Sequence, residues 1–142
     1  MSNRRGFTLV ELVVVVLILG ILAAVAVPKL LKTTTRASEN SLRQTLSVLR
    51  DAIERYSVAN TGKLPGDLGT EADLKADLKP YLRNFPKNPI KDSAIVSVQT
   101  TGALMTGTVN GSPGWRYDNK TGQILANSNG TVIDGSLRYD EL

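Results

Sequence analysis

The stretch RRGFTLVELVVVVLILGILAAVAVPKLL, residues 4–31, decides how this chain is organised. Between Phe7 and Val27 the only ionisable side chain is that of Glu11. As an α-helix this run would be about 30 Å long, enough to cross the hydrocarbon core of a bilayer. A carboxylate in such a segment costs roughly 3 kcal/mol unless it finds a partner, so Glu11 needs an explanation.

Three interpretations of the segment compete. A secretory signal would have its basic start at Arg4 and Arg5 and its small residues at Ala24-Val25-Ala26. A plain transmembrane anchor would need only the apolar length. The third interpretation is a leader that is cut on the cytoplasmic side, between Gly6 and Phe7, so that the apolar helix stays on the mature protein.

Glu11 distinguishes these interpretations, because only the third gives the carboxylate a use. A cut after Gly6 would create a free ammonium group on Phe7, and Glu11 lies four residues later, about one helical turn away. In an assembly, the Glu11 carboxylate of one subunit can meet the Phe7 ammonium of its neighbour. Each buried charge would then neutralise the other.

The octapeptide at residues 5–12, RGFTLVEL, resembles the processing motif of type IV pilins and type II secretion pseudopilins. The resemblance implies that a peptidase cuts between Gly6 and Phe7 and that the new N-terminal Phe7 is N-methylated. It also implies that Glu11 supports subunit recruitment and assembly. Pro28 stands where this family often has a proline, at the end of the apolar stretch.

An amphipathic pattern continues the helix beyond Pro28. Apolar residues recur at spacings of four and three, at Leu42, Leu46, Leu49, Ile53 and Tyr56. The pattern predicts one helix from Thr8 to Ala59, hydrophobic all round in its first half and amphipathic in its second. Pro28 should kink or locally melt it. The stripe is expected to pack on a globular domain, because about two heptads are short for a coiled coil.

The remaining sequence predicts a short helix over Glu71–Arg83, with Thr70 and Asp73 resembling a capping box, followed by strands. The strand candidates are residues 94–100, 105–109, 115–117, 123–126 and 131–133. We therefore expect an α+β fold, with a long N-terminal helix, a short helix and a small antiparallel sheet, as in pilins. The boundaries are a leader at 1–6, a transmembrane and filament-core helix at 7–36, and a globular domain at 37–142 that includes the second half of the long helix.

Composition excludes several kinds of function. The 142 residues contain no cysteine and no histidine, which removes disulfides, thiolate metal sites and the commonest general base. The net charge of +4 is scattered, so no nucleic-acid partner is expected, and the protein is not expected to be an enzyme. Type IV pilins often close their C-terminal region with a disulfide, so its absence favours a pseudopilin.

A metal site is a further expectation that the resemblance raises. Major pseudopilins commonly carry calcium near the C-terminal loops, where this chain offers Asp118, Asn129 and Asp134, with Asn119 and Asn127 nearby in sequence. Calcium takes six to eight oxygens, preferably from several carboxylates. Residues of these types more often form turns. No cofactor is therefore expected, and calcium is the single candidate.

The leading hypothesis is a structural subunit of a type II secretion pseudopilus. The resemblance implies a single pass through the bacterial inner membrane, with the globular domain on the periplasmic side, and later a filament in the periplasm or on the cell surface. It implies as partners other copies of the chain, minor pseudopilins, the inner-membrane assembly platform and a prepilin peptidase that also methylates. Lys29, Lys32 and Arg36 beyond the apolar run oppose the positive-inside rule, so orientation rests on the resemblance.

Two alternatives stay open. One is a type IV pilus subunit, major or minor, for adhesion, motility or DNA uptake. The other is a secreted soluble binding domain whose residues 1–26 are removed as a conventional signal peptide.

Overall fold

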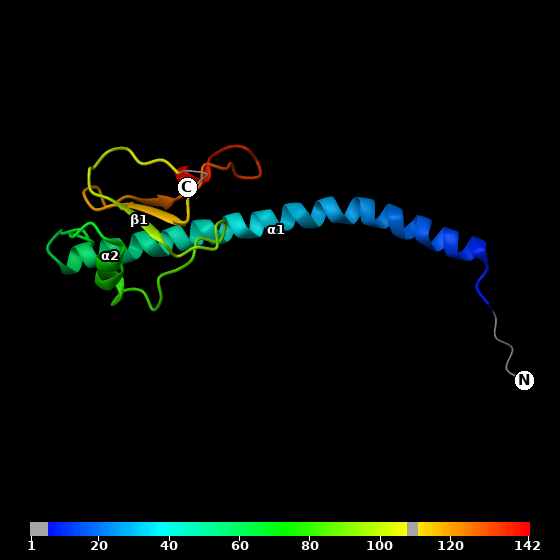
Figure 1. Cartoon of the computed structure of the whole chain (residues 1–142), viewed down its shortest axis with the longest axis horizontal. Helices are drawn as coiled ribbons and strands as arrows, with labels where there is room; N and C mark the ends of the chain where they lie inside the picture. Colours follow the sequence, from blue (N-terminus) through cyan, green and yellow to red (C-terminus); the bar gives the residue numbers. More distant parts are fainter. Residues whose placement is uncertain (1–5, 108–110) are drawn as a thin grey trace, which may run out of the picture. The chain divides into compact units, whose positions relative to one another are not determined.

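The computed structural model describes residues 6–107 and 111–142. The chain divides into two compact units, Met1–Thr35 and Arg36–Leu142. The division falls within α1 (Leu9–Ala59), a helix of 51 residues that carries the blue-to-green part of the chain in Figure 1. The prediction of one long helix from Thr8 to Ala59 is confirmed to within one residue.

The first part of α1 exposes every side chain from Leu9 to Thr34. Pro28 lies inside the helix, and helical structure continues on both sides of it. The predicted local melting at Pro28 is therefore wrong. Proline removes one backbone donor but has a φ that suits a helix, and the neighbouring turns keep their own hydrogen bonds.

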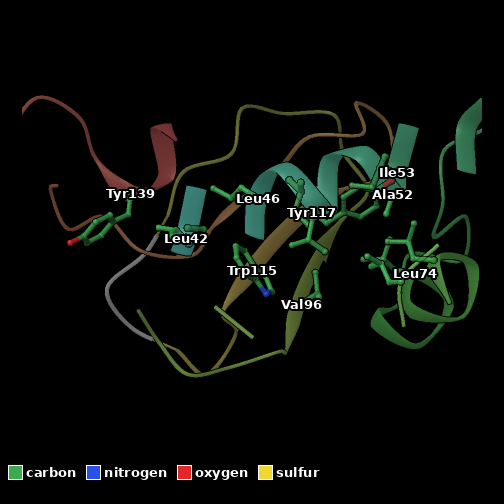
Figure 2. Close-up of a cluster of buried hydrophobic side chains, with 14 of the residues drawn as sticks. Leu42, Leu46, Ala52, Ile53, Leu74, Val96, Trp115, Tyr117 and Tyr139 are labelled. Carbon is green, nitrogen blue, oxygen red and sulfur yellow. The ribbon is translucent and has the colours of Figure 1, made fainter. Parts of the chain in front are cut away.

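The second part of α1 buries one stripe of side chains in its own unit. The buried apolar members are Leu42, Leu46, Leu49, Ala52 and Ile53. They join Trp115, Tyr117 and Val96 of the sheet in one hydrophobic core. Figure 2 shows core side chains of the helix and of the strands together. The prediction that the stripe packs on the globular domain is confirmed.

The sheet has three strands in the order β1 (Val96–Gln99), β2 (Trp115–Asp118) and β3 (Ile124–Ala126). β2 and β3 form the predicted antiparallel hairpin. β1 pairs with β2 in parallel, with Val96 opposite Trp115, so the prediction of a wholly antiparallel sheet is wrong. About fifteen residues separate β1 from β2, long enough for the chain to return before it re-enters the sheet.

Two of the weaker strand predictions are also wrong. Residues 105–107 are not in a strand, and 108–110 lie outside the described residues. The segment 131–133 forms only an isolated bridge between Thr131 and Arg138. Both segments lie in Gly- and Ser-rich sequence, where few side chains are available to hold an extended chain against a neighbour.

The short helix α2 (Glu71–Leu78) is confirmed but ends earlier than predicted. Pro80 follows closely and cannot continue the hydrogen-bond pattern. Thr70 caps the helix by accepting from the Asp73 amide at 3.2 Å, as the sequence predicts. The Asp73 carboxylate accepts from the Leu68 amide at 2.8 Å, so it ties the preceding loop to α2.

Two buried aromatic residues of β2 hold the proline-rich loops in place. Trp115 Nε1 donates to the Pro86 carbonyl at 3.0 Å, and the Tyr117 hydroxyl donates to the Pro65 carbonyl at 2.9 Å. Both side chains have no exposed surface. Because buried Trp and Tyr need partners for their polar atoms, these bonds fix where the loops cross the sheet.

Candidate functional site

The N-terminal end of α1 is held by a capping box that joins Thr8 and Glu11. The Thr8 amide and the Thr8 hydroxyl both donate to Glu11 Oε2 at 2.9 Å, and the Glu11 amide donates to Thr8 Oγ1 at 3.2 Å. Helices begin with unsatisfied amides, and this reciprocal pair satisfies two of them. The spacing Thr-x-x-Glu is a known sequence signal for a helix start, and our sequence analysis missed it at this position.

The capping box changes how Glu11 is understood. Its two side-chain bonds both end on Oε2, and among the described residues no hydrogen bond ends on Oε1. The carboxylate has room for a further donor, because an ionised carboxylate accepts up to about four hydrogen bonds. Glu11 therefore has a structural use within its own chain and capacity for another partner.

The predicted cleavage point, between Gly6 and Phe7, lies before α1 in non-helical chain. Phe7 is 81% exposed. A Cβ added at Gly6 would meet no atom within 4 Å, and no positive φ is recorded there. The fold therefore does not require glycine at position 6, and a requirement for it has to come from an enzyme that acts on this segment.

The apolar half of α1 is the other part of the candidate site. Among the described residues α1 is the one helix that is long and apolar enough to cross a membrane, and its most apolar window is not buried at all. The large side chains from Val10 to Leu31 are between 46% and 69% exposed. A surface of this size and composition needs lipid or other protein around it.

Comparison with known proteins identifies the family. Residues 1–27 match the family described as the prokaryotic N-terminal methylation motif. The chain is 31% identical over 139 residues to type II secretion system core protein G of Vibrio cholerae, covering 91% of this chain and 94% of that protein. The chain belongs to the type II secretion system core protein G family.

Other relatives match shorter parts of the chain. Core protein G of Klebsiella pneumoniae is 34% identical over 88 residues, which is 61% of this chain and 63% of that protein. The match thus spans less than two thirds of that relative's length. A type IV major pilin of Neisseria gonorrhoeae is 32% identical over 109 residues, 77% of this chain and 54% of the pilin. No solved structure matches the chain.

Asp118 is the first of the residues that the sequence suggests as calcium ligands. The Asp118 carboxylate is buried, and both of its oxygens accept hydrogen bonds. The donors are the amides of Gly102, Lys120 and Thr121 and the side chain of Gln99. Burial alone would raise the pKa of Asp118, but these bonds outweigh it and lower the pKa below its usual range.

The other candidates do not gather around Asp118. Asp134 Oδ1 accepts from the amide and hydroxyl of Ser136 in a local turn, and the Asn129 side chain is exposed. Asn119 donates to the Gly66 carbonyl, and Asn127 to the Pro113 carbonyl. Within residues 6–107 and 111–142, no three His, Cys, Asp or Glu side chains lie together as a metal site. The placement of these side chains gives the calcium expectation no support, and calcium binding stays a prediction.

Proposed function

We propose that this chain is the major structural subunit of a type II secretion pseudopilus, processed between Gly6 and Phe7 and assembled into a filament. One observation carries the proposal: a processing motif at residues 1–27 begins an entirely exposed apolar helix that leads into a separately packed domain. A signal peptide would be discarded, and in a plain anchor Glu11 would serve only as the cap of its own helix, with its remaining acceptor capacity unused. A filament subunit uses the motif, the apolar helix and the carboxylate.

Processing would alter the charge at the start of α1. The N-terminus of a helix carries about half a positive charge, and a new ammonium on Phe7 would lie just before it. The Glu11 carboxylate, already bound to Thr8, offsets both. Glu11 can still accept a hydrogen bond from the Phe7 ammonium of an adjacent subunit. The two subunits would then be joined by one pair of opposite charges.

Assembly would exchange lipid around the apolar half of α1 for the same half of neighbouring subunits. Leu, Ile and Val side chains gain little from this exchange by hydrophobicity alone, because lipid tails are equally apolar. Packing and the charge pair would therefore have to favour the filament over dispersed subunits. The domains, with a core of their own, would cover the outside of the helix bundle.

The partners and location follow from the same proposal. The chain would pass once through the inner membrane, with Arg4 and Arg5 in the cytoplasm and the domain in the periplasm. Its partners would be other copies of itself, minor pseudopilins, the inner-membrane assembly platform and the prepilin peptidase, which would also methylate Phe7. The protein would act by filament growth and not as an enzyme.

Intact-mass measurement of the mature chain tests the proposal. The expected mass corresponds to residues 7–142 with one added methyl group. A mature chain that begins at Val27 would mean that residues 1–26 are a discarded signal, and the filament proposal would be wrong.

A type IV pilus subunit is the second candidate, favoured by the match to the gonococcal pilin over 77% of this chain. Deletion of the gene separates the two functions, since loss of protein secretion with surface pili intact supports the pseudopilus. Loss of surface pili with secretion intact would support the pilus.

A further inference from the structure

The C-terminal segment, residues 127–142, contains little regular structure. It has one bridge, between Thr131 and Arg138, and a single turn of 3-10 helix, η1 (Tyr139–Glu141). Ordering each residue of such a segment costs about 1–2 kcal/mol of conformational entropy. Side-chain contacts with the rest of the domain must therefore fix it.

Glu39 of α1 makes the first of these contacts. Its side chain is buried, with 6% of the residue exposed, and Oε1 accepts from the Ile133 amide at 2.6 Å and from the Tyr139 hydroxyl at 3.3 Å. In Figure 2, Tyr139 lies beside Leu42, at one end of the row of core residues along α1. A buried carboxylate is tolerated only with such donors, so Glu39 and the C-terminal segment depend on each other.

Burial and the Glu39 carboxylate together raise the pKa of Tyr139, burial being the larger cause. The Tyr139 hydroxyl therefore holds its proton more tightly than a free phenol does, which favours its role as a donor to Glu39.

Asp140 makes the second contact, from within the C-terminal segment. Its side chain is 4% exposed and forms a bidentate pair with Arg138, at 2.9 Å to Nε and 2.8 Å to Nη2. Oδ2 also accepts from the Gly107 amide at 2.5 Å, which ties η1 to the loop before β2. A Cβ at Gly107 would lie 2.5 Å from the Ser128 carbonyl, so only glycine allows this approach.

Arg50 makes a third contact farther along α1. Its guanidinium donates to the Leu142 carbonyl at 2.9 Å and to the Ile124 carbonyl at 3.4 Å. Glu39 and Arg50 are eleven residues apart, which is about 16 Å along a helix. Two side chains of opposite charge thus hold the C-terminal segment at two separate points of α1.

A bound calcium ion is another way to fix an irregular loop, and it takes six to eight oxygen ligands, carboxylates among them. In this domain both oxygens of Asp118 and both oxygens of Asp140 already accept hydrogen bonds from protein donors, and Glu39 Oε1 accepts two. We propose that Glu39 and Asp140 fix the C-terminal segment in place of a metal, and that this segment folds independently of calcium.

Hydrogen exchange on the full chain in detergent micelles tests the proposal. Exchange of the amides in residues 131–139 is measured in EGTA and in about 5 mM CaCl₂, a concentration above the weakest dissociation constants of extracellular calcium modules. The expected result is equal exchange in both. Slowing of exchange by calcium, several-fold or more, would overturn the proposal.

The second arm compares Glu39→Gln with Glu54→Gln, which changes an exposed carboxylate of the same helix. Glu39→Gln should speed exchange in residues 131–139 roughly tenfold, because the amide oxygen is a weaker acceptor than the carboxylate. Glu54→Gln should leave it unchanged. Equal behaviour of the two variants would overturn the role of Glu39.

A third arm guards against global unfolding. Exchange of β2 and β3 amides reports whether the domain is folded. If Glu39→Gln speeds exchange in these strands as well, Tyr139→Phe and Asp140→Asn decide the question. Tyr139→Phe removes the hydroxyl that donates to Glu39, and Asp140→Asn weakens the contacts with Arg138 and Gly107. Faster exchange confined to the C-terminal segment supports the proposal, and no change in either variant contradicts it.

Discussion

The two halves of α1 have similar backbones and opposite surroundings. From Leu9 to Thr34 every side chain is exposed, whereas between Leu42 and Ile53 one stripe is buried against the sheet. The first half is apolar on all faces and the second on one face only. One helix thus lies in two environments. The part with a single apolar face packs in the domain, and the part that is apolar on all faces is left for lipid or other subunits.

The largest expected effect is at the start of the first half. Gly6→Asp should abolish processing, because a charged side chain would occupy the residue before the predicted cut. Only the unprocessed form should be seen on an immunoblot.

Gly20→Ala is the matched control, since Gly20 is also exposed with no atom within 4 Å of an added Cβ. It should be processed normally. If Gly6→Asp is processed normally, the chain is not cut between Gly6 and Phe7.

Glu11→Ala tests the use of the carboxylate in the first half. Membrane insertion should be unchanged, while sheared or purified filaments should fall at least tenfold, because the Phe7 ammonium of a neighbour loses its partner. Filament yield is measured against the membrane-bound pool of the same strain.

Thr8→Val separates capping from intersubunit pairing at Glu11. It removes the hydroxyl that bonds Glu11 but leaves the carboxylate, and loss of a cap costs about 1 kcal/mol. Filament yield should fall much less than in Glu11→Ala. Equal losses in the two variants would mean that capping, and not pairing between subunits, is the main role of Glu11.

Leucine-to-alanine substitutions in the two halves of α1 distinguish their surroundings directly. Leu46→Ala should lower the free energy of unfolding of the domain by about 3 kcal/mol, since Leu46 is 1% exposed in the core. Leu17→Ala, at a 62% exposed position of the first half, should leave it unchanged. Urea unfolding in detergent, followed by Trp115 fluorescence, reports both. Equal destabilisation would contradict the separation of the two surroundings.

The smallest expected effect is the pH dependence of the domain. The pKa of Asp118 is lowered in the folded state, so the unfolded chain binds its proton more readily. The stabilisation from Asp118 is therefore complete above the ordinary aspartate pKa of about 4 and is lost as pH falls through the lower folded value. Asp118→Asn should flatten the acid limb of a stability curve. If the acid side of the curve is unchanged in Asp118→Asn, other groups cause the acid sensitivity of the domain.

Local patterns made most of this fold predictable from the sequence. The 3.6-residue period identified α1 and its buried stripe, and the Thr70 cap identified the start of α2. Strand direction was not predictable, because β1 pairs with β2 through contacts that no local pattern encodes. The C-terminal contacts of Glu39 span more than ninety residues of sequence and were missed for the same reason.

The candidate site was predictable as a motif and not as geometry. The spacing of Gly6, Phe7 and Glu11 indicated processing and assembly, while the capping bonds of Glu11 to Thr8 emerged only from the structure. The signal for that cap was present in the sequence. The same carboxylate can serve its own helix end and a neighbouring subunit, so the processing motif does not reveal the cap.

The most direct test of the account is the behaviour of a fragment that starts at Arg36, where the second unit begins. The account predicts a soluble monomer by light scattering, with a melting temperature within about 3 °C of the domain in the full chain. An insoluble, obligately oligomeric or unfolded fragment would contradict it, because the domain would then depend on the apolar half of α1.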